Sequence, residues 1–151
     1  METIEVRRVI AAPIDDVFDW VSNADNYTNA PLFVAAKLVR PGNGAAYGAG
    51  AVRRFIFPFA VVHEEITHFD PPHSFGYRVV KSNPPVRHEG GAVVLTSNAQ
   101  GTDLVWSSTA ELRLPVFSEQ ATRLVLPRLF GRAFSQVLDA AQSALEARAT
   151  R

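Results

Sequence analysis

Apolar and polar residues alternate along most of residues 4–112, and this alternation is typical of half-buried strands. Strands are predicted for residues 4–9, 33–40, 51–57, 61–69, 75–79, 89–96 and 102–112. Turn sequences separate several of them, including Pro41-Gly42-Asn43-Gly44 and Asp70-Pro71-Pro72. Because these connections are too short for parallel crossovers, we expect an antiparallel sheet.

Two parts of the chain follow a helical period instead. After Pro13, apolar residues at positions 17, 18, 20 and 21 form a stripe, and a second short helix is predicted near residues 24–28. Helical spacing returns over residues 126–145 and predicts one long C-terminal helix. Ser118 and Glu119 suit a helix start, and Pro127 should kink or restart the helix. The predicted order is therefore a strand, two short helices, six strands and a long helix.

The composition is that of one globular domain over residues 1–151. Hydrophobic residues make up 47% of the chain and charged residues 20%, which is sufficient for a packed core. The 15 Lys and Arg residues equal the 15 Asp and Glu residues, so the basic excess typical of nucleic-acid-binding proteins is missing. We therefore expect no nucleic-acid partner.

The chain has no Cys, which excludes disulfides, thiolate metal sites and Cys nucleophiles. Its first residues lack the basic-then-apolar pattern of a signal peptide. No apolar run approaches the roughly 18 residues that a membrane span needs. We expect a cytoplasmic location without membrane insertion.

Several short local sequences occur in a distinctive order along nearly the whole chain. They are Ile10-Ala11-Ala12-Pro13 followed by Val17-Phe18, then Gly50-Ala51-Val52-Arg53, Glu64-Glu65-Ile66, Asp70-Pro71-Pro72, Gly76-Tyr77-Arg78-Val79, and Gly101-Thr102 with Trp106. With the order of elements, they resemble the START-like (SRPBCC) superfamily of polyketide cyclases, lipid carriers and hormone receptors. The resemblance implies an α+β helix-grip fold, in which a seven-stranded curved antiparallel sheet wraps around the C-terminal helix. It also implies a cavity between sheet and helix, but no single function.

The register of one predicted hairpin places Arg53 opposite Glu64. If Pro58 and Phe59 form a two-residue turn, Phe57 faces Ala60, and Arg53 then faces Glu64 on the buried side of the sheet. A buried charge needs a partner, and this register supplies one. Some START-like enzymes use an Arg and a Glu at matching positions for proton transfer, so the resemblance makes Arg53 and Glu64 candidate catalytic residues. The alternative is a salt bridge without chemistry.

Aromatic residues are the second signal, because core and cavity wall are the same surface in this fold. Candidate ligand-binding residues are Trp20, Phe55, Tyr77, Glu89, Trp106, Phe130 and Phe134. Glu89 is included because it shares its alternation with Val93 and Leu95, although a solvent-facing rim position is an alternative. A cavity lined in this way suits a flat or fatty molecule.

The sequence does not indicate a metal or a cofactor. His63 and His68 are an odd number of residues apart and should face opposite sides of one strand, so no metal site is expected. The glycines at positions 42–50 precede a strand, whereas a dinucleotide-binding loop opens a helix. We expect a flexible hairpin loop there that gates the cavity. No Gly-x-Ser-x-Gly nucleophile motif is present.

Three functions remain open. The first is binding of a small, mostly apolar, lipid-like or polyketide-like molecule by a monomer or homodimer. The second is a cyclase, aromatase or isomerase in which Glu64 moves a proton and Arg53 stabilises developing negative charge. The third is a partner-binding module with a vestigial cavity, which a collapsed cavity beside an exposed apolar patch would favour.

Overall fold

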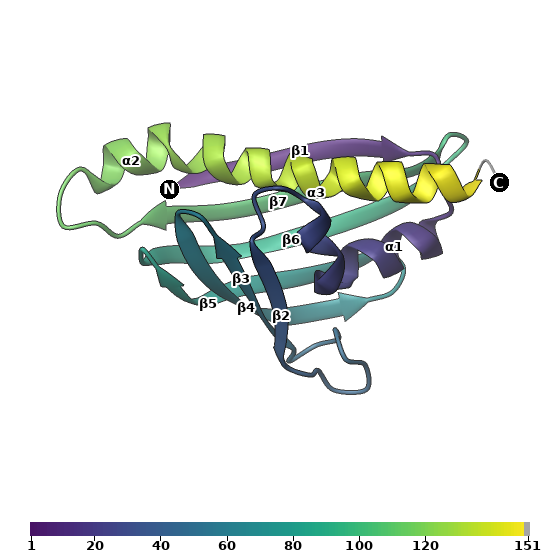
Figure 1. Ribbon diagram of the computed structural model, residues 1–151, viewed down its shortest axis with the longest axis horizontal. Coiled ribbons are helices and arrows are strands. Elements are labelled where there is room, and N and C mark those ends of the chain that lie inside the picture. Colours follow the sequence, from purple (N-terminus) through teal and green to yellow (C-terminus); the bar gives the residue numbers. More distant parts are fainter. Residues whose placement is uncertain (150–151) are drawn as a thin grey trace.

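The structure, a computed structural model, describes residues 1–149 as a curved antiparallel sheet with helices against its inner face (Figure 1). The strands are β1 (Glu2–Ile10), β2 (Ala35–Arg40), β3 (Val52–Phe57), β4 (Ala60–Asp70), β5 (Ser74–Asn83), β6 (Val86–Asn98) and β7 (Gly101–Leu112). The helices are α1 (Ile14–Ser22), the 3-10 helix η1 (Ala24–Asn29), α2 (Ser118–Leu124) and α3 (Leu126–Ala149). The sheet order β1-β7-β6-β5-β4-β3-β2 confirms the predicted helix-grip fold.

Helix α1 forms where the sequence predicts it. Pro13 sets its first turn, Asp15 and Asp16 lie near its positive end, and its apolar stripe is buried. Phe18 makes edge-to-face contacts with Phe69 and Phe75, at 5.4 and 6.0 Å between ring centroids. This packing fixes α1 near the C-terminal end of α3, away from α2 (Figure 1).

The predicted interruption at Pro127 is also present. Helix α2 ends at Leu124 and α3 begins at Leu126, with Val125 between them in right-handed helical conformation. Proline cannot donate the backbone hydrogen bond that would join the two helices smoothly. Helix α3 then runs along β1 and packs against α1 (Figure 1).

The β3–β4 hairpin has the predicted two-residue turn. Phe57 pairs with Ala60, and Arg53 pairs with Glu64. Differences from the predicted strands are at their ends. Strand β6 begins at Val86, earlier than the predicted start at residue 89. The prediction starts too late because an irregularity in the first half of the strand, described below, interrupts the alternation of apolar and polar residues.

Candidate functional site

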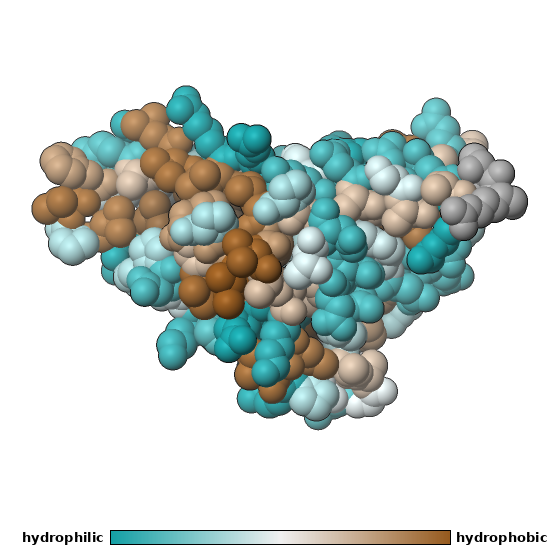
Figure 2. Space-filling model, in the orientation of Figure 1, coloured by the Kyte–Doolittle hydropathy of each residue, from teal (hydrophilic) through white to brown (hydrophobic). Residues whose placement is uncertain are grey.

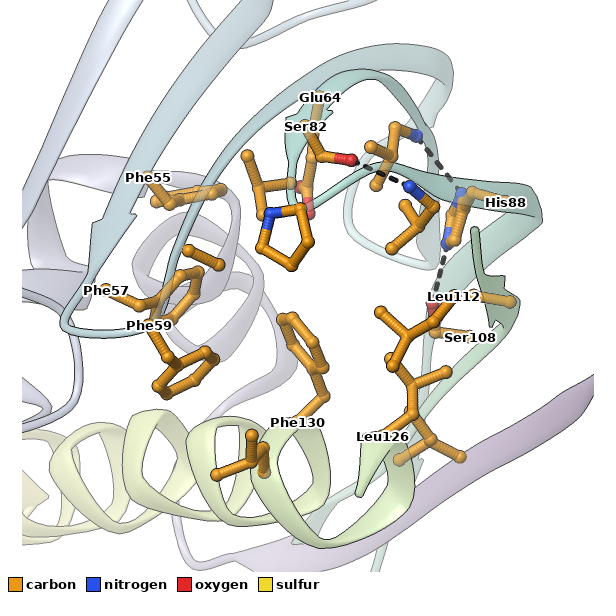
Figure 3. A pocket seen from close by; sticks show the side chains of 18 of the residues that line it. Phe55, Phe57, Phe59, Glu64, Ser82, His88, Ser108, Leu112, Leu126 and Phe130 are labelled. Carbon is orange, nitrogen blue, oxygen red and sulfur yellow. Dashed lines mark hydrogen bonds between the residues drawn. The ribbon is translucent and has the colours of Figure 1, made fainter. Parts of the chain in front are cut away.

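A cavity of about 320 Å³ lies between the inner face of the sheet and the helices α2 and α3 (Figure 3). This volume is at the lower end of the range for small-molecule pockets, roughly 300–1,000 Å³. Much of its lining is aromatic or aliphatic and includes Phe33, Phe55, Phe57, Phe59, Trp106, Leu126, Phe130 and Phe134. The polar lining is a smaller set: Tyr27, Glu64, Tyr77, Ser82, His88 and Ser108.

The aromatic wall is held by contacts among its own rings. Trp106 on β7 stacks on Phe134 of α3, with ring centroids 4.3 Å apart and planes 11° from parallel. Phe57 on β3 meets Phe130 edge-to-face at 5.7 Å. Because these contacts join the sheet to α3, the wall is formed before any ligand enters.

Arg53 and Glu64 form the predicted cross-strand pair. Arg53 Nη2 donates to Glu64 Oε1 at 2.7 Å. The Arg53 side chain is 0% exposed and lies behind the cavity wall, whereas Glu64 is 12% exposed and lines the cavity. The pair therefore presents only its carboxylate to a bound molecule.

Aromatic rings surround the Arg53 guanidinium. Its Cζ lies 5.1 Å from the Phe55 ring centroid, 5.4 Å from that of Tyr27 and 5.7 Å from that of Phe75. Nε and Nη1 have no acceptor with hydrogen-bond geometry, and the nearby Tyr27 hydroxyl instead donates to the Val21 carbonyl at 2.6 Å. Cation–π attraction and Glu64 are therefore the main compensation for burying this charge.

Burial raises the pKa of Glu64 above its usual value, although the neighbouring Arg53 charge opposes the shift. A carboxyl group in this state takes up a proton more readily than one in water. Glu64 Oε1 already accepts from Arg53 Nη2. The other carboxylate oxygen makes no hydrogen bond with residues 1–149 and is open to a ligand.

A second group of polar side chains surrounds His88, a residue that the sequence pattern does not predict to be in the site. The Val79 amide donates to His88 Nδ1 at 3.1 Å, so Nδ1 is the acceptor and Nε2 carries the hydrogen of the neutral ring. Nε2 lies 2.6 Å from Ser108 Oγ (Figure 3). Burial, with a smaller contribution from the Arg78 charge, lowers the pKa of His88 to about 4. His88 is therefore neutral at pH 7 and donates to Ser108.

Tyr77 and Trp106 extend this polar group. The Tyr77 ring stacks on His88 at 5.6 Å, and Trp106 Nε1 donates to the Tyr77 hydroxyl oxygen at 2.8 Å. Burial and the charge of Glu64 raise the pKa of Tyr77, so the phenol keeps its hydrogen. Tyr77 and Ser108 thus bring hydroxyl groups to the same cavity that contains the Glu64 carboxylate.

A bulge in β6 explains why His88 faces the cavity and Glu89 does not. His88 pairs with Ala110, but Gly90 pairs with Thr109, so Glu89 is the extra residue in the strand. Gly90 has φ 147°, a conformation that favours glycine. Glu89 is exposed and does not line the cavity, so its inclusion among the ligand-binding candidates is wrong and the solvent-facing alternative is the one observed.

Comparison with known proteins gives the family. Residues 1–146 match the family described as polyketide cyclase/dehydrase and lipid transport. The chain belongs to this family. No curated protein matches the chain.

Solved structures agree with the polyketide cyclase/dehydrase and lipid transport family in fold. The Zhui aromatase/cyclase from Streptomyces is 20% identical, with a TM-score of 0.80 over 98% of this chain and 95% of its own. A Thermus thermophilus protein is 17% identical, with a TM-score of 0.80 over 97% and 99%. A START superfamily protein from Mycobacterium smegmatis is 12% identical, with a TM-score of 0.73 over 96% and 97%. At these identities the likeness shows the shared fold.

In this family member, six of the nine predicted site residues line the cavity: Phe55, Glu64, Tyr77, Trp106, Phe130 and Phe134. Arg53 lies behind Glu64, and Glu89 points outward. Trp20 is buried in the core but is not part of the cavity wall. Helix α1 lies near the C-terminal end of α3 (Figure 1), whereas the residues of α3 that line the cavity are at its N-terminal end. The expected place of Trp20 in the ligand site is wrong.

The glycine-rich loop lies outside the cavity wall. None of residues 41–50 lines the cavity, and Tyr47 instead donates to Asp25 Oδ2 at 2.6 Å beside η1. The cavity lining therefore does not support the expected gate. Within residues 1–149, no helix is long and apolar enough to cross a membrane, and no three His, Asp or Glu side chains are grouped to hold a metal ion.

Proposed function

We propose that this protein binds one small, mostly apolar molecule in the cavity, with a polar group of that molecule facing Glu64 and Ser108. The observation that carries the proposal is an open, preformed aromatic cavity of about 320 Å³ with a few convergent polar side chains. An open cavity does not favour the vestigial-cavity alternative. A hydroxyl group could donate to Glu64 and accept from Ser108 or Tyr77, so a neutral oxygen-bearing ligand fits better than an anionic one.

Binding can be tested with a neutral bicyclic compound that carries one hydroxyl group, 2-naphthol. Trp106 lines the cavity and Trp20 does not, so 2-naphthol should shift the indole NMR signal of Trp106 and leave that of Trp20 unchanged. Ala110→Trp should abolish saturable one-to-one binding, because Ala110 lines the cavity. Val94→Trp is the matched control, because Val94 is exposed on β6. Equal 2-naphthol binding by wild type and Ala110→Trp would place the site elsewhere.

A second candidate function, proton transfer, is favoured by the raised pKa of Glu64 and its open oxygen. In this proposal the Glu64 carboxylate removes an acidic C–H proton from a bound ketone, and Tyr77 or Ser108 donates a hydrogen bond to the enolate oxygen. Arg53, behind the wall, holds Glu64 in place and does not itself touch the substrate.

This second function can be measured as exchange of the α-protons of 2-tetralone in deuterated water, followed by NMR. The wild type should accelerate exchange above the buffer rate, and Glu64→Gln should lose the acceleration while still binding the ketone. Exchange that is unchanged in Glu64→Gln would exclude Glu64 as the base.

A further inference from the structure

Four exposed apolar side chains lie together beside the cavity, on the segment that leads into and out of α2. They are Val116, Phe117, Leu124 and Val125, and we call them the apolar collar. Phe117 is 72% exposed and Val116 66%, so neither side chain contributes much to the core. Figure 2 shows a hydrophobic surface over this end of the molecule, where α2 forms a protruding ridge in Figure 1.

The collar is continuous with the cavity. Val125 belongs to both, and Leu114 and Ala121 of the same segment line the cavity from inside. An apolar surface therefore runs from the outside of α2 into the binding space. A molecule covering the collar would lie beside the cavity lining.

Phe117 is held in a conformation that disfavours it. Its φ is 58°, the left-handed region that residues other than Gly, Asn and Asp rarely adopt. Ser118 fixes the turn, because its Oγ accepts from the Leu114 amide at 2.6 Å and donates to the Leu114 carbonyl at 2.7 Å. Neither the backbone strain nor the exposure of the ring favours folding, which indicates a role in binding.

Two arginines next to the collar are available to a partner. Of the three arginines in residues 113–128, Arg113 lies 3.7 Å from the Glu111 carboxylate, which leaves Arg123 and Arg128 against Glu119. Arg123 and Arg128 are exposed and form no ion pair within residues 1–149. Two copies meeting through their collars would bring these like charges together, which disfavours a dimer through this face.

We propose that the apolar collar docks on an anionic lipid bilayer, with Phe117 and Val116 entering the headgroup region and the arginines meeting anionic headgroups. A bilayer offers apolar chains beneath negative charge, and a convex apolar ridge flanked by Arg complements both. The contact is peripheral. It would let an apolar ligand pass between bilayer and cavity with little exposure to water.

The test is co-sedimentation with vesicles of phosphatidylcholine that contain roughly one-third phosphatidylserine, an anionic membrane lipid. The wild type should bind these vesicles, bind pure phosphatidylcholine vesicles more weakly, and dissociate as salt is added. Phe117→Asn should weaken binding about tenfold or more, since it removes the most exposed apolar side chain of the collar. Asn tolerates the left-handed conformation, so this variant should keep its melting temperature.

Two controls separate this proposal from general stickiness and from cavity binding. Val94→Asn changes an exposed apolar residue on β6 and should leave vesicle binding unchanged. Ala110→Trp should bind vesicles normally even though its cavity is filled, so loss of ligand binding and loss of docking are distinguishable. No binding by the wild type, or equal binding by Phe117→Asn, would overturn the proposal. So would a concentration-dependent dimer that Phe117→Asn dissolves, because a second copy would then cover the collar.

Discussion

The Arg53–Glu64 pair can be tested by replacing each partner and then both, with Arg53→Met and Glu64→Gln. Arg53 is fully buried among aromatic rings, and its only ionic partner among residues 1–149 is Glu64, at 2.7 Å. Met keeps the length of the arginine stem, and Gln keeps the shape of the carboxylate. The double variant removes both charges and leaves no buried ion without a partner.

The structure makes the two single replacements unequal. Removing one partner of a buried pair costs about 3–5 kcal/mol, chiefly because the other charge stays buried. In Glu64→Gln the amide oxygen can still accept from Arg53, and the rings offer cation–π attraction, so we expect a loss of about 2–4 kcal/mol. In Arg53→Met, Glu64 faces the cavity and can take up a proton, so we expect a smaller loss of roughly 1–3 kcal/mol.

Urea unfolding at pH 7 and pH 5 gives all four free energies of unfolding. At pH 7 the double variant should lose less than the sum of the singles, with a coupling of about 2 kcal/mol or more. Without Arg53, the pKa of Glu64 rises further above its unfolded value. Between the pKa of Glu64 in the unfolded chain and its higher pKa in the folded variant, folded Arg53→Met binds more protons than its unfolded form. The stability of Arg53→Met therefore falls as the pH rises through this range. Its loss relative to wild type should therefore be smaller at pH 5. A coupling within about 0.5 kcal/mol of zero would show that the contact contributes nothing.

Three other replacements test the site. Phe134→Ala should lower stability by about 3–5 kcal/mol in urea unfolding, since Phe134 is buried and stacks on Trp106. An unchanged value would argue against α3 as a core element. The wild type should lose stability as the pH falls from 6.5 to 4, because unfolded His88 takes up a proton in this range and folded His88 does so only near pH 4. His88→Gln should reduce this loss by roughly 1–2 kcal/mol, since solvent screens part of the effect. Identical pH profiles would contradict the neutral histidine. Gly91→Ala should cost about 1–3 kcal/mol and alter the near-ultraviolet circular dichroism, since a Cβ at this position would clash with the Tyr77 ring. An unchanged spectrum would mean that the ring is free to move.

The Arg53–Glu64 contact was predictable because a short turn sets the register of a hairpin. Pro58 and Phe59 leave one simple pairing, and every pair farther from the turn then follows by counting. The long helix and its break at Pro127 were predictable for a similar reason, since both depend on local periodicity and on a missing N–H group. Local rules were sufficient for these features.

His88, Trp20 and Phe117 depend on information that local rules do not contain. Two consecutive glycines in a strand, at 90 and 91, were a signal for the bulge, but alternation alone placed Glu89 inside. Trp20 was expected in the cavity wall because it is an aromatic residue on a buried stripe, but which part of the core it joins depends on where α1 packs. The left-handed conformation of Phe117 goes against the preference of its residue type.

The bulge at Glu89 and Gly90 has a consequence for how relatives of this protein are compared. If a relative lacks a glycine at the position of Gly90 and its strand pairs regularly, the residues on the α2 side of that point exchange faces. The residue aligned with Glu89 would then enter the cavity and the one aligned with His88 would leave it. Two homologues with identical side chains around this point could thus enclose opposite chemistry, one with a neutral imidazole and the other with a second carboxylate beside Glu64. Ligand preference across the family should therefore be compared after strand pairing is aligned, because a column-by-column alignment of residues is one position out of phase along this edge of the cavity.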